Sequence, residues 1–489
     1  MSVRGLVEES NDPTKAGSEA RSWANATAKL IEWSYLYCDQ SVSRPPDARS
    51  VEEAVDLALD WEVVEIGLQG GRAGRVRVFE DAHGIGIEPL SSASIETLDA
   101  ILEGIDTQNI EKDDTTPSLE PAFEWFAAQQ GSRDVYRRLP SWMGGLYVKN
   151  MQNYARKRPW DLPEDTDLGG FTVREARPLI GTLRGMSLLQ LSLFRGEPHP
   201  NTAYLSMTPE TLSKFLRKYN PRNGGVGAFI KALTYSGLPG SSPYSTPIIP
   251  WGDLLIMPFP LLAEGAEERL VLRAAASNPA TSGLLGKSLG TLGRRWGDRL
   301  GSIPNIKVVQ EVKVFDPGRR KVGDLDIVAL CRNSGKGLIV EAKWPIDARN
   351  LSDAWKQEAA IDKGRKQIGR LKAAIADGAT VKLPPDWPGI HEVEWTWIVG
   401  TARYLDARQV SDDVAATSLR LVEQILPVGD LNELLTRLRD YPFPSEGKDF
   451  LLRWKKIKVN GQSIRCRMIE IMPSASVPPA DRKRSTGWT

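Results

Sequence analysis

The sequence predicts an α/β domain in the C-terminal half of the chain, with a mixed sheet flanked by helices, and a mainly helical N-terminal region. Apolar runs of strand length separated by short turns such as "DPGRRKVG" and "CRNSGKG" predict neighbouring strands. A long amphipathic segment then predicts a helix and a further apolar run another strand. In order, the expected elements are a helix at 283–300, strands at 306–315, 322–331 and 337–344, a helix at 351–377 and a strand at 392–400, an αβββαβ core.

The chain is long enough for about three domains, and its composition changes along its length. The segment "SGLPGSSPYSTPIIP", residues 236–250, is dense in Gly, Ser and Pro and predicts a domain boundary. An acidic, threonine-rich segment, "DTQNIEKDDTTPSLEP", predicts an earlier linker. The expected regions are a helical or mixed region at 1–110, a helical accessory region at 121–240, an α/β domain at 251–445, and a C-terminal hairpin and tail at 446–489.

Outside the αβββαβ core, local signals predict further elements. "GRVRVFEDAHGIGIEPL" predicts a hairpin near the N-terminus, and Asn460-Gly461 a two-residue turn near the C-terminus. "TPETLSKFLRKY" predicts a helix that Thr208 caps. More helices are expected at 264–277, 411–426 and 429–441.

Glycines at positions 283, 286, 290, 293 and 297 fall on one face of the first core helix. Glycine lowers helix stability, so this pattern predicts the close approach of another backbone. Packing of the helix on the sheet is the favoured explanation, and contact with a DNA strand is the alternative.

Composition argues against binding through overall charge, a disulfide framework and a histidine-based zinc site. Lys and Arg number 63 and Asp and Glu 62, so no global charge favours nucleic acid or membrane. Three separated cysteines favour a reducing compartment, and three isolated histidines have no zinc-ligand spacing. The sequence shows neither a signal peptide nor an apolar segment long enough to span a membrane. We therefore expect a cytoplasmic protein without a membrane partner.

Two of the predicted strands carry charges in their middle. Asp324 and Asp326 lie two residues apart in "KVGDLDIVALC", and Glu341 and Lys343 two apart in "LIVEAKW". Side chains alternate along a strand, so each pair is expected on one face, where the four groups converge.

Carboxylates crowded in this way repel one another unless a cation lies among them. Oxygen ligands without His or Cys favour Mg²⁺ or Mn²⁺. Such a metal polarises a phosphodiester and activates water, and a neighbouring lysine orients that water or offsets charge on the phosphate. The pattern predicts a phosphodiesterase site formed by these carboxylates and Lys343. Asp324, at the mouth of its strand, is expected to contribute to metal binding through a second metal or a water.

"GDLDIVAL" followed by "LIVEAKW" resembles the PD-(D/E)xK nuclease superfamily, the restriction-endonuclease-like fold. The resemblance implies that Asp326 and Glu341 bind the metal and that Lys343 is catalytic. It also implies a role for Gln367, because members of the superfamily often use a Gln or Lys from the helix after the motif. The match covers roughly a quarter of the chain, and the motif is short.

The resemblance implies a metal-dependent endonuclease acting on nucleic acid, DNA in preference to RNA, and similar to bacterial restriction and phage-defence effectors. Residues 313–375 contain 14 Lys or Arg and 8 Asp or Glu, a local excess that phosphate contact explains. A solvated basic helix explains it equally well.

Two alternatives remain open at the level of sequence. One is a non-catalytic nucleic-acid-binding or scaffolding protein that retains the fold, and the other is an exposed strand pair with ordinary ion pairs. The N-terminal half is expected to bind, sense or restrain, and to carry any contact with a second copy or a partner protein.

Overall fold

The computed structural model describes residues 13–38, 48–72, 76–89, 115–129, 135–158, 160, 162–196, 204–238, 241–263, 270–272, 274–275, 290–344, 351–402, 414–441, 444–459 and 462–472. The chain forms two compact units. Unit 1 comprises Met1–Glu88, Gly104–Gly286 and Trp454–Arg467, and unit 2 comprises Pro89–Glu103, Lys287–Arg453 and Met468–Thr489. The chain is a mixed α/β protein with mixed sheets, as the sequence predicts in general terms.

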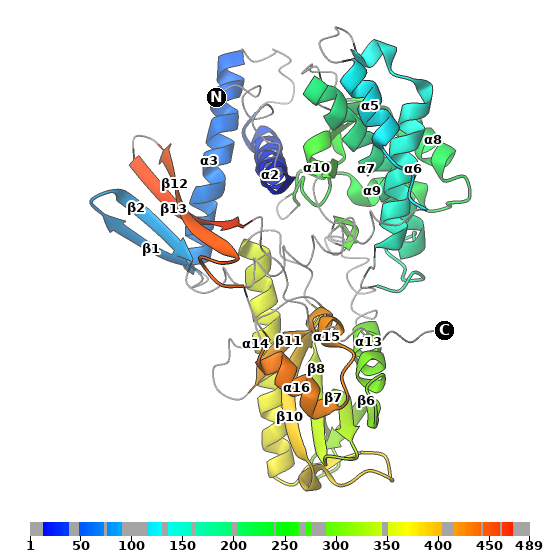
Figure 1. The fold of residues 1–489 in the computed structure, drawn as a ribbon, viewed down its shortest axis with the longest axis vertical. Coiled ribbons are helices and arrows are strands. Elements are labelled where there is room, and N and C mark those ends of the chain that lie inside the picture. The colour runs from blue at the N-terminus through cyan, green and yellow to red at the C-terminus, as the bar shows by residue number, and fades with distance from the viewer. Residues whose placement is uncertain are drawn as a thin grey trace. The chain divides into compact units, whose positions relative to one another are not determined.

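Unit 2 is built on one six-stranded sheet with the order β11-β10-β8-β7-β6-β9 (Figure 1). Strands β6, β7 and β8 are antiparallel neighbours, whereas β8, β10 and β11 run parallel. Its elements are α13 (Gly290–Gly301), β6 (Ile306–Phe315), β7 (Lys321–Cys331), β8 (Lys336–Ala342), α14 (Leu351–Ala376), β9 (Thr380–Val381), β10 (Glu394–Thr401), β11 (Ala415–Ser418), α15 (Leu419–Ile425) and α16 (Leu431–Arg439). The expected order of helix, three strands, helix and strand is present from α13 to β10.

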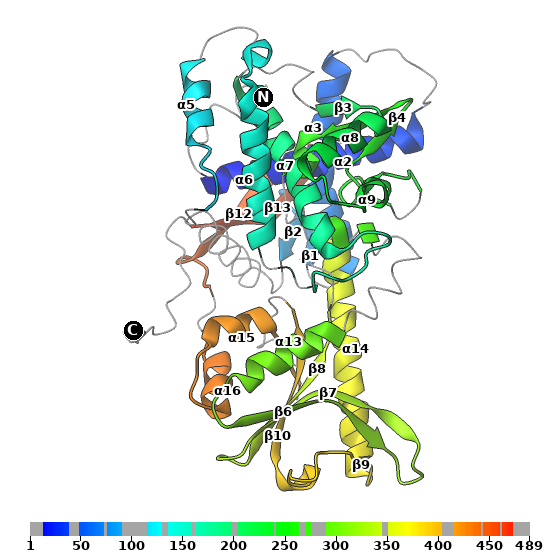
Figure 2. The same ribbon diagram turned by 90° about the vertical axis from the view of Figure 1, so that its right-hand side faces the viewer.

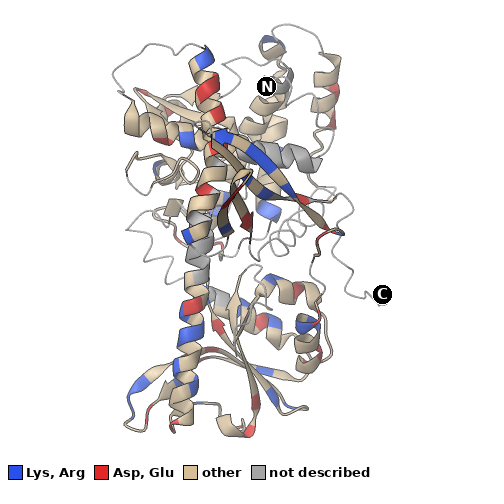
Figure 3. Cartoon of the chain, turned by 90° about the vertical axis from the view of Figure 1, so that its left-hand side faces the viewer, with Lys and Arg blue, Asp and Glu red and all other residues tan. Residues whose placement is uncertain are grey.

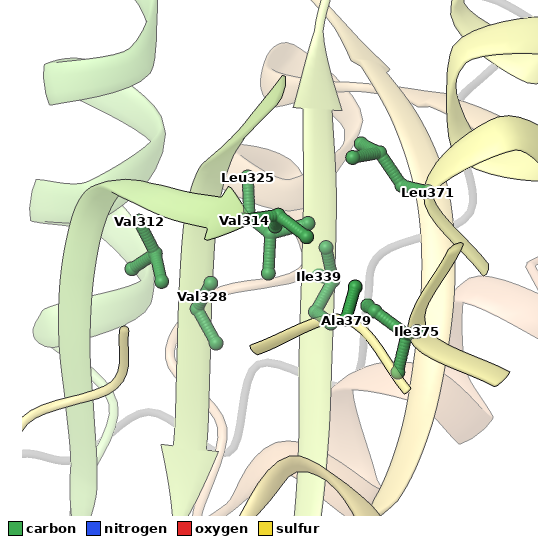
Figure 4. Close-up of a cluster of buried hydrophobic side chains, with 8 residues drawn as sticks. All are labelled: Val312, Val314, Leu325, Val328, Ile339, Leu371, Ile375 and Ala379. Carbon is green, nitrogen blue, oxygen red and sulfur yellow. The ribbon is translucent and has the colours of Figure 1, made fainter. Parts of the chain in front are cut away.

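Helices cover both faces of this sheet (Figure 2). On one face α13 approaches closely: a Cβ on Gly400 of β10 would lie 2.9 Å from the ring of Trp296, which is fully buried. On the other face α14 contributes Leu371 and Ile375 to a core cluster (Figure 4). The strand residues of that cluster are Val312, Val314, Leu325, Val328 and Ile339.

The glycines of α13 that the structure describes support packing of the helix on the sheet. A Cβ on Gly297 would lie 2.2 Å from the side chain of Gln310 in β6, and one on Gly293 would lie 3.9 Å from Ile327 in β7. Residues 281–289, with the two earlier glycines, are outside the described residues.

The helix expected at 411–426 is partly wrong. Residues Ala415–Ser418 form β11, which pairs in parallel with β10, and only Leu419–Ile425 are helical. Ser418 ends the strand and caps α15, because its side chain accepts a hydrogen bond from the Leu421 amide at 3.1 Å. Pairing with a neighbouring strand overrides the weak local preference of this segment.

Unit 1 combines helices with one small sheet and most of a second, since residues 450–453 of β12 and 468–471 of β13 are assigned to unit 2. The helices are α2 (Pro13–Tyr37), α3 (Ala48–Arg72), α5 (Glu120–Ala128), α6 (Ser141–Lys157), α7 (Val173–Gly196), α8 (Pro209–Tyr219), α9 (Val226–Leu233) and α10 (Phe259–Ala263). One sheet has the order β3-β5-β4, from Tyr204–Met207, Leu254–Pro258 and Ile249–Trp251. Helix α8 begins as predicted, because Thr208 accepts a hydrogen bond from the Thr211 amide.

The second sheet joins the two ends of the chain. Its order is β1-β2-β13-β12, from Val76–Asp81, Gly84–Pro89, Gln462–Ile471 and Phe450–Val459. The strands of both predicted hairpins are neighbours in this sheet, and β13 also pairs in parallel with β2. The predicted turn at Asn460-Gly461 lies outside the described residues. A lone hairpin is marginally stable in water, so each hairpin stabilises the other.

The segment at 236–250 lies inside unit 1, and this differs from the predicted domain boundary. Ser245, Thr246 and Ile248 are buried, and the backbone of Ile248 exchanges hydrogen bonds with Leu233 and Tyr235. No helix in the described part of the chain is long and apolar enough to cross a membrane.

We predict opposite effects for two glycine substitutions in unit 2. Gly400→Ala should destabilise the protein by about 1–3 kcal/mol, because the added methyl group meets Val340 and Trp296. Gly369→Ala, in α14, should stabilise it by up to about 1 kcal/mol, because nothing lies within 4 Å of the new Cβ. Chemical denaturation of both variants tests this. Equal effects would show that α13 does not pack on β10 as described.

Candidate functional site

The predicted charged residues meet where the pairing between β7 and β8 ends. The last register pair toward the site is Ile327 with Val340, and Asp326 and Glu341 are the next residue on each strand. A carboxylate oxygen of Asp326 accepts a hydrogen bond from the Ala342 amide at 2.8 Å. The two carboxylates are therefore held side by side at the point where the ladder opens.

Strand β10 and helix α14 position Lys343. The Lys343 amide donates to the Gly400 carbonyl at 2.7 Å, which extends the contact between β8 and β10 beyond the end of β8. A Cβ on Gly364 of α14 would lie 3.2 Å from Cγ of Lys343 and 3.0 Å from Val399. The lysine stem consequently lies against α14, and the absence of a side chain at Gly364 makes that approach possible.

The ammonium group of Lys343 connects the two sides of the site. It forms an ion pair with Glu341, and it donates a long hydrogen bond of 3.4 Å to Oε1 of Gln367. Glu341 is 2% exposed, and the Lys343 side chain is 19% exposed. The structure thus brings together four of the predicted site residues: Asp326, Glu341, Lys343 and Gln367.

Burial dominates the electrostatics of the two carboxylates. It raises the pKa of Glu341 to about 7, and the negative charge of Asp326 adds to this rise, while Lys343 opposes it. Burial also raises the pKa of Asp326, against the opposing effects of the Ala342 amide and Lys343. Two carboxylates that hold a proton this readily are under mutual repulsion, and a further cation would relieve it.

Asp324 makes no ion pair or hydrogen bond with these four predicted site residues, although its charge contributes to the raised pKa of Asp326. Its Oδ2 pairs with Lys321 at 2.7 Å, and the side chain is about one-third exposed. Leu325 belongs to the cluster that includes Leu371 of α14, and a Cβ on Gly323 would lie 3.2 Å from Leu371, so Asp324 between them faces away from α14. The expectation that Asp324 and Asp326 share one face does not hold. Glu311, opposite this stretch on β6, has a φ of 54° and interrupts the regular alternation.

Asp326 and Glu341 are the residues of the site that could hold a divalent cation. Among the described residues, no three His, Cys, Asp or Glu side chains are grouped so that they could hold a metal. Asp326 and Glu341 form a pair of oxygen ligands, and Mg²⁺ is commonly bound by one or two carboxylates together with water and substrate phosphate. Burial and the neighbouring Asp326 raise the pKa of Glu341, so a positive charge close to its carboxylate would be favourable.

Sequence reasoning missed the residues that support the site through their backbone. These are Ala342, whose amide binds Asp326, and the two glycines that admit neighbouring groups, Gly364 and Gly400. A signal existed for Gly364: it interrupts an otherwise strong helical segment, "EAAIDKGRKQIGRLKAAI", at a cost in helix stability. Nothing local distinguishes Ala342 or Gly400.

Basic residues of α14 lie on its exposed side near Gln367. Lys363, Lys366 and Arg370 are exposed, and Lys363 and Arg370 lie one turn before and one turn after Gln367. The side chain of Lys356, a fourth predicted member of this group, is outside the described residues. The basic excess of the sequence therefore borders the site.

A comparison with protein-family models gives no match, and comparisons with curated proteins and with solved structures give no match either.

We predict that the stability of the metal-free protein decreases as pH rises through neutrality. The pKa of Glu341 is raised from its ordinary value of 4.5 to about 7, so proton binding stabilises the folded state at low pH and this contribution is lost as pH rises through about 7. In the presence of chelator, the melting temperature should fall by about 2–4 °C between roughly pH 5 and pH 8.

Glu341→Gln should remove most of that decrease. Glu394→Gln, at an exposed glutamate of β10, is the matched control and should keep the wild-type pH profile. An unchanged profile in Glu341→Gln would mean that the Glu341 carboxyl is not the group that titrates.

Proposed function

We propose that the protein is a metal-dependent nuclease that hydrolyses phosphodiester bonds within nucleic acid, DNA in preference to RNA. The observation that supports this most is the meeting of Asp326, Glu341 and Lys343 at the open end of the β7–β8 ladder. Two desolvated carboxylates beside one lysine have no structural advantage over apolar residues at the same place. Their chemistry suits a site where a metal and a phosphate bind.

Asp326 and Glu341 are the residues that would hold Mg²⁺ or Mn²⁺. When bound, the metal would polarise the phosphodiester and lower the pKa of a coordinated water. The Ala342 amide keeps Asp326 oriented, because the hydrogen bond fixes one carboxylate oxygen and leaves the other available. Burial of Glu341 excludes competing water from the ligand oxygens.

Lys343 has two tasks in this proposal. Its ammonium group offsets negative charge that develops on the phosphate, and it orients the attacking water. For these tasks the ammonium group would leave its ion pair with Glu341. Gln367 then remains as the neutral acceptor that keeps the ammonium group at the site.

The exposed cations of α14 are the proposed contacts to the substrate backbone. Lys363, Lys366 and Arg370 lie beside Gln367 on one helix, next to the reacting groups. Contacts of this kind are independent of base sequence and sensitive to salt. They favour a long polyanion over a small phosphoester as the substrate.

The biological role in bacterial restriction or phage defence rests on the resemblance alone. The rival proposal is a nucleic-acid-binding or scaffolding protein that retains the fold without cleavage. The intact group of Asp326, Glu341 and Lys343 favours the nuclease. Incubation of the purified chain with supercoiled plasmid, linear DNA and RNA, with Mg²⁺ or with chelator, separates the two.

Lys343→Ala should reduce the rate of Mg²⁺-dependent cleavage by at least about 100-fold, because it removes the only ammonium group that contacts Glu341 among the described residues. Lys336→Ala is a matched control on the same strand, where the lysine pairs with Glu394 at the surface. It should cleave at the wild-type rate. Circular dichroism confirms that both variants fold. Cleavage by Lys343→Ala within a few-fold of wild type would contradict the assignment.

The two aspartates of β7 should behave differently. Asp326→Asn should abolish cleavage and raise the melting temperature of the metal-free protein, because it removes a buried charge beside Glu341. Asp324→Asn should leave most of the activity, since Asp324 pairs with Lys321 and acts on Asp326 only through its charge. Cleavage rates and melting temperatures of both variants are the measurement. An inactive Asp324→Asn together with an active Asp326→Asn would reverse the assignment.

A further inference from the structure

The sheet β1-β2-β13-β12 has one face that α3 covers, and a second face, here called the open face, on which no core cluster lies among the residues that the structure describes. Helix α3 covers the first, where Val63 of the helix packs with strand residues from all four strands. These strand residues are Val76, Ile87, Ile457, Ile464 and Cys466. The residues that alternate with them point to the other face.

An arginine lies between two aromatic rings on the open face. The Arg465 guanidinium lies 4.7 Å from the ring centroid of Trp454 and 5.7 Å from that of Phe79. The two rings form an edge-to-face pair at 6.4 Å. Gly86 admits this arrangement, because a Cβ there would lie 2.4 Å from the Phe79 ring. Trp454 nevertheless stays 39% exposed.

Cations outnumber carboxylates on this face. Asp81 pairs with Arg465, and Glu88 accepts from both Arg77 and Arg467 at 2.7 Å. Among the described side chains, no carboxylate forms an ion pair with Lys456 or Lys458. Those two lysines alternate with the buried Ile457 and are exposed. Figure 3 shows Lys and Arg gathered along the β12–β13 hairpin.

Protection of an edge strand is the simplest alternative account. Strand β12 is an edge of its sheet, and lysines on edge strands prevent pairing with other chains. Edge protection explains the lysines of β12 but not Trp454, which is 39% exposed in the same row. An exposed aromatic ring promotes association with other chains, which is the opposite of protection. Of the four cations in residues 450–459, "FLLRWKKIKV", Arg453 pairs with Glu470, whereas Lys456 and Lys458 lie on the open face in the same row as Trp454.

We propose that the open face of this sheet binds single-stranded nucleic acid. Trp454, Lys456 and Lys458 follow one another at alternate positions, about 7 Å apart along β12. Lysines in such a row contact successive phosphates, and the exposed ring of Trp454 stacks on a base. A single strand is the expected partner because paired bases do not present their faces to a side chain. The surface is separate from the carboxylate site and does not require cleavage.

The test is binding of the full-length chain to fluorescent oligothymidine of about 16 nucleotides, in chelator so that no cleavage occurs. Lys456→Gln/Lys458→Gln should weaken binding by about tenfold and reduce the slope of log K against log salt by about 1.4, since each lost phosphate contact contributes about 0.7. Trp454→Ala should weaken binding about tenfold with an unchanged salt slope, and Trp454→Phe should restore most of it.

The matched control is Lys149→Gln/Lys231→Gln, which removes two exposed lysines from helices α6 and α9 of the same unit. It should bind oligothymidine as the wild type does. Equal weakening by the control, or no weakening by either β12 variant, overturns the proposal. The proposal is also overturned if Lys456→Gln/Lys458→Gln binds oligothymidine as the wild type does and only aggregates more. Protection of the edge strand would then be the role of these two lysines.

Two further ligands complete the experiment. The proposal is overturned if the chain binds a duplex of the same length more tightly than the single strand. It is also overturned if the chain binds vesicles of phosphatidylserine and does not bind oligothymidine. The outcome is independent of the nuclease proposal: loss of binding in the β12 variants supports the surface even if the chain cleaves nothing. Cleavage that persists without single-strand binding supports the nuclease alone.

Discussion

The desolvation of two neighbouring carboxylates is the constraint on which the centre of unit 2 depends. Asp326 and Glu341 come from neighbouring strands and share one desolvated place, and the pKa of Glu341 rises to about 7 as a result. Lys343 and the Ala342 amide compensate only part of that cost. Carboxylates with raised pKa values gather at functional sites, and this is the physical basis of the proposed activity.

Close approach of the surrounding backbone keeps those groups in place. Gly364 allows α14 to lie on the Lys343 stem, and Gly400 allows β10 to pass beneath Trp296 while its carbonyl holds the Lys343 amide. The lysine is thus positioned by two elements far from it in sequence. The site tolerates little displacement, because each glycine is already at contact distance from its neighbour.

Local patterns predicted the parts of the fold that local forces determine. The three antiparallel strands, α14 and the cap at Thr208 follow from periodicity, short turns and side-chain chemistry. Asp326, Glu341 and Lys343 meet as predicted because a short turn sets the register of β7 on β8. Asp324 does not, because its placement depends on the irregular backbone at Glu311, which no residue pattern announces. Strand β11 was likewise missed, since it depends on β10.

The pairing of β2 with β13 cannot be predicted from local sequence patterns either, because it also depends on a partner strand far away in the chain. The ladder between β2 and β13 joins residues near 86 and 465, and its formation depends on the surface that α3 offers to both hairpins. Each hairpin alone shows an ordinary alternating pattern. Only when they form one sheet do Phe79, Arg465 and Trp454 stack, and only then do the lysines of β12 share a face with them. Tertiary pairing brings cations of that hairpin to one face of the sheet. The composition of the chain, with its net charge of +1, does not reveal this local excess.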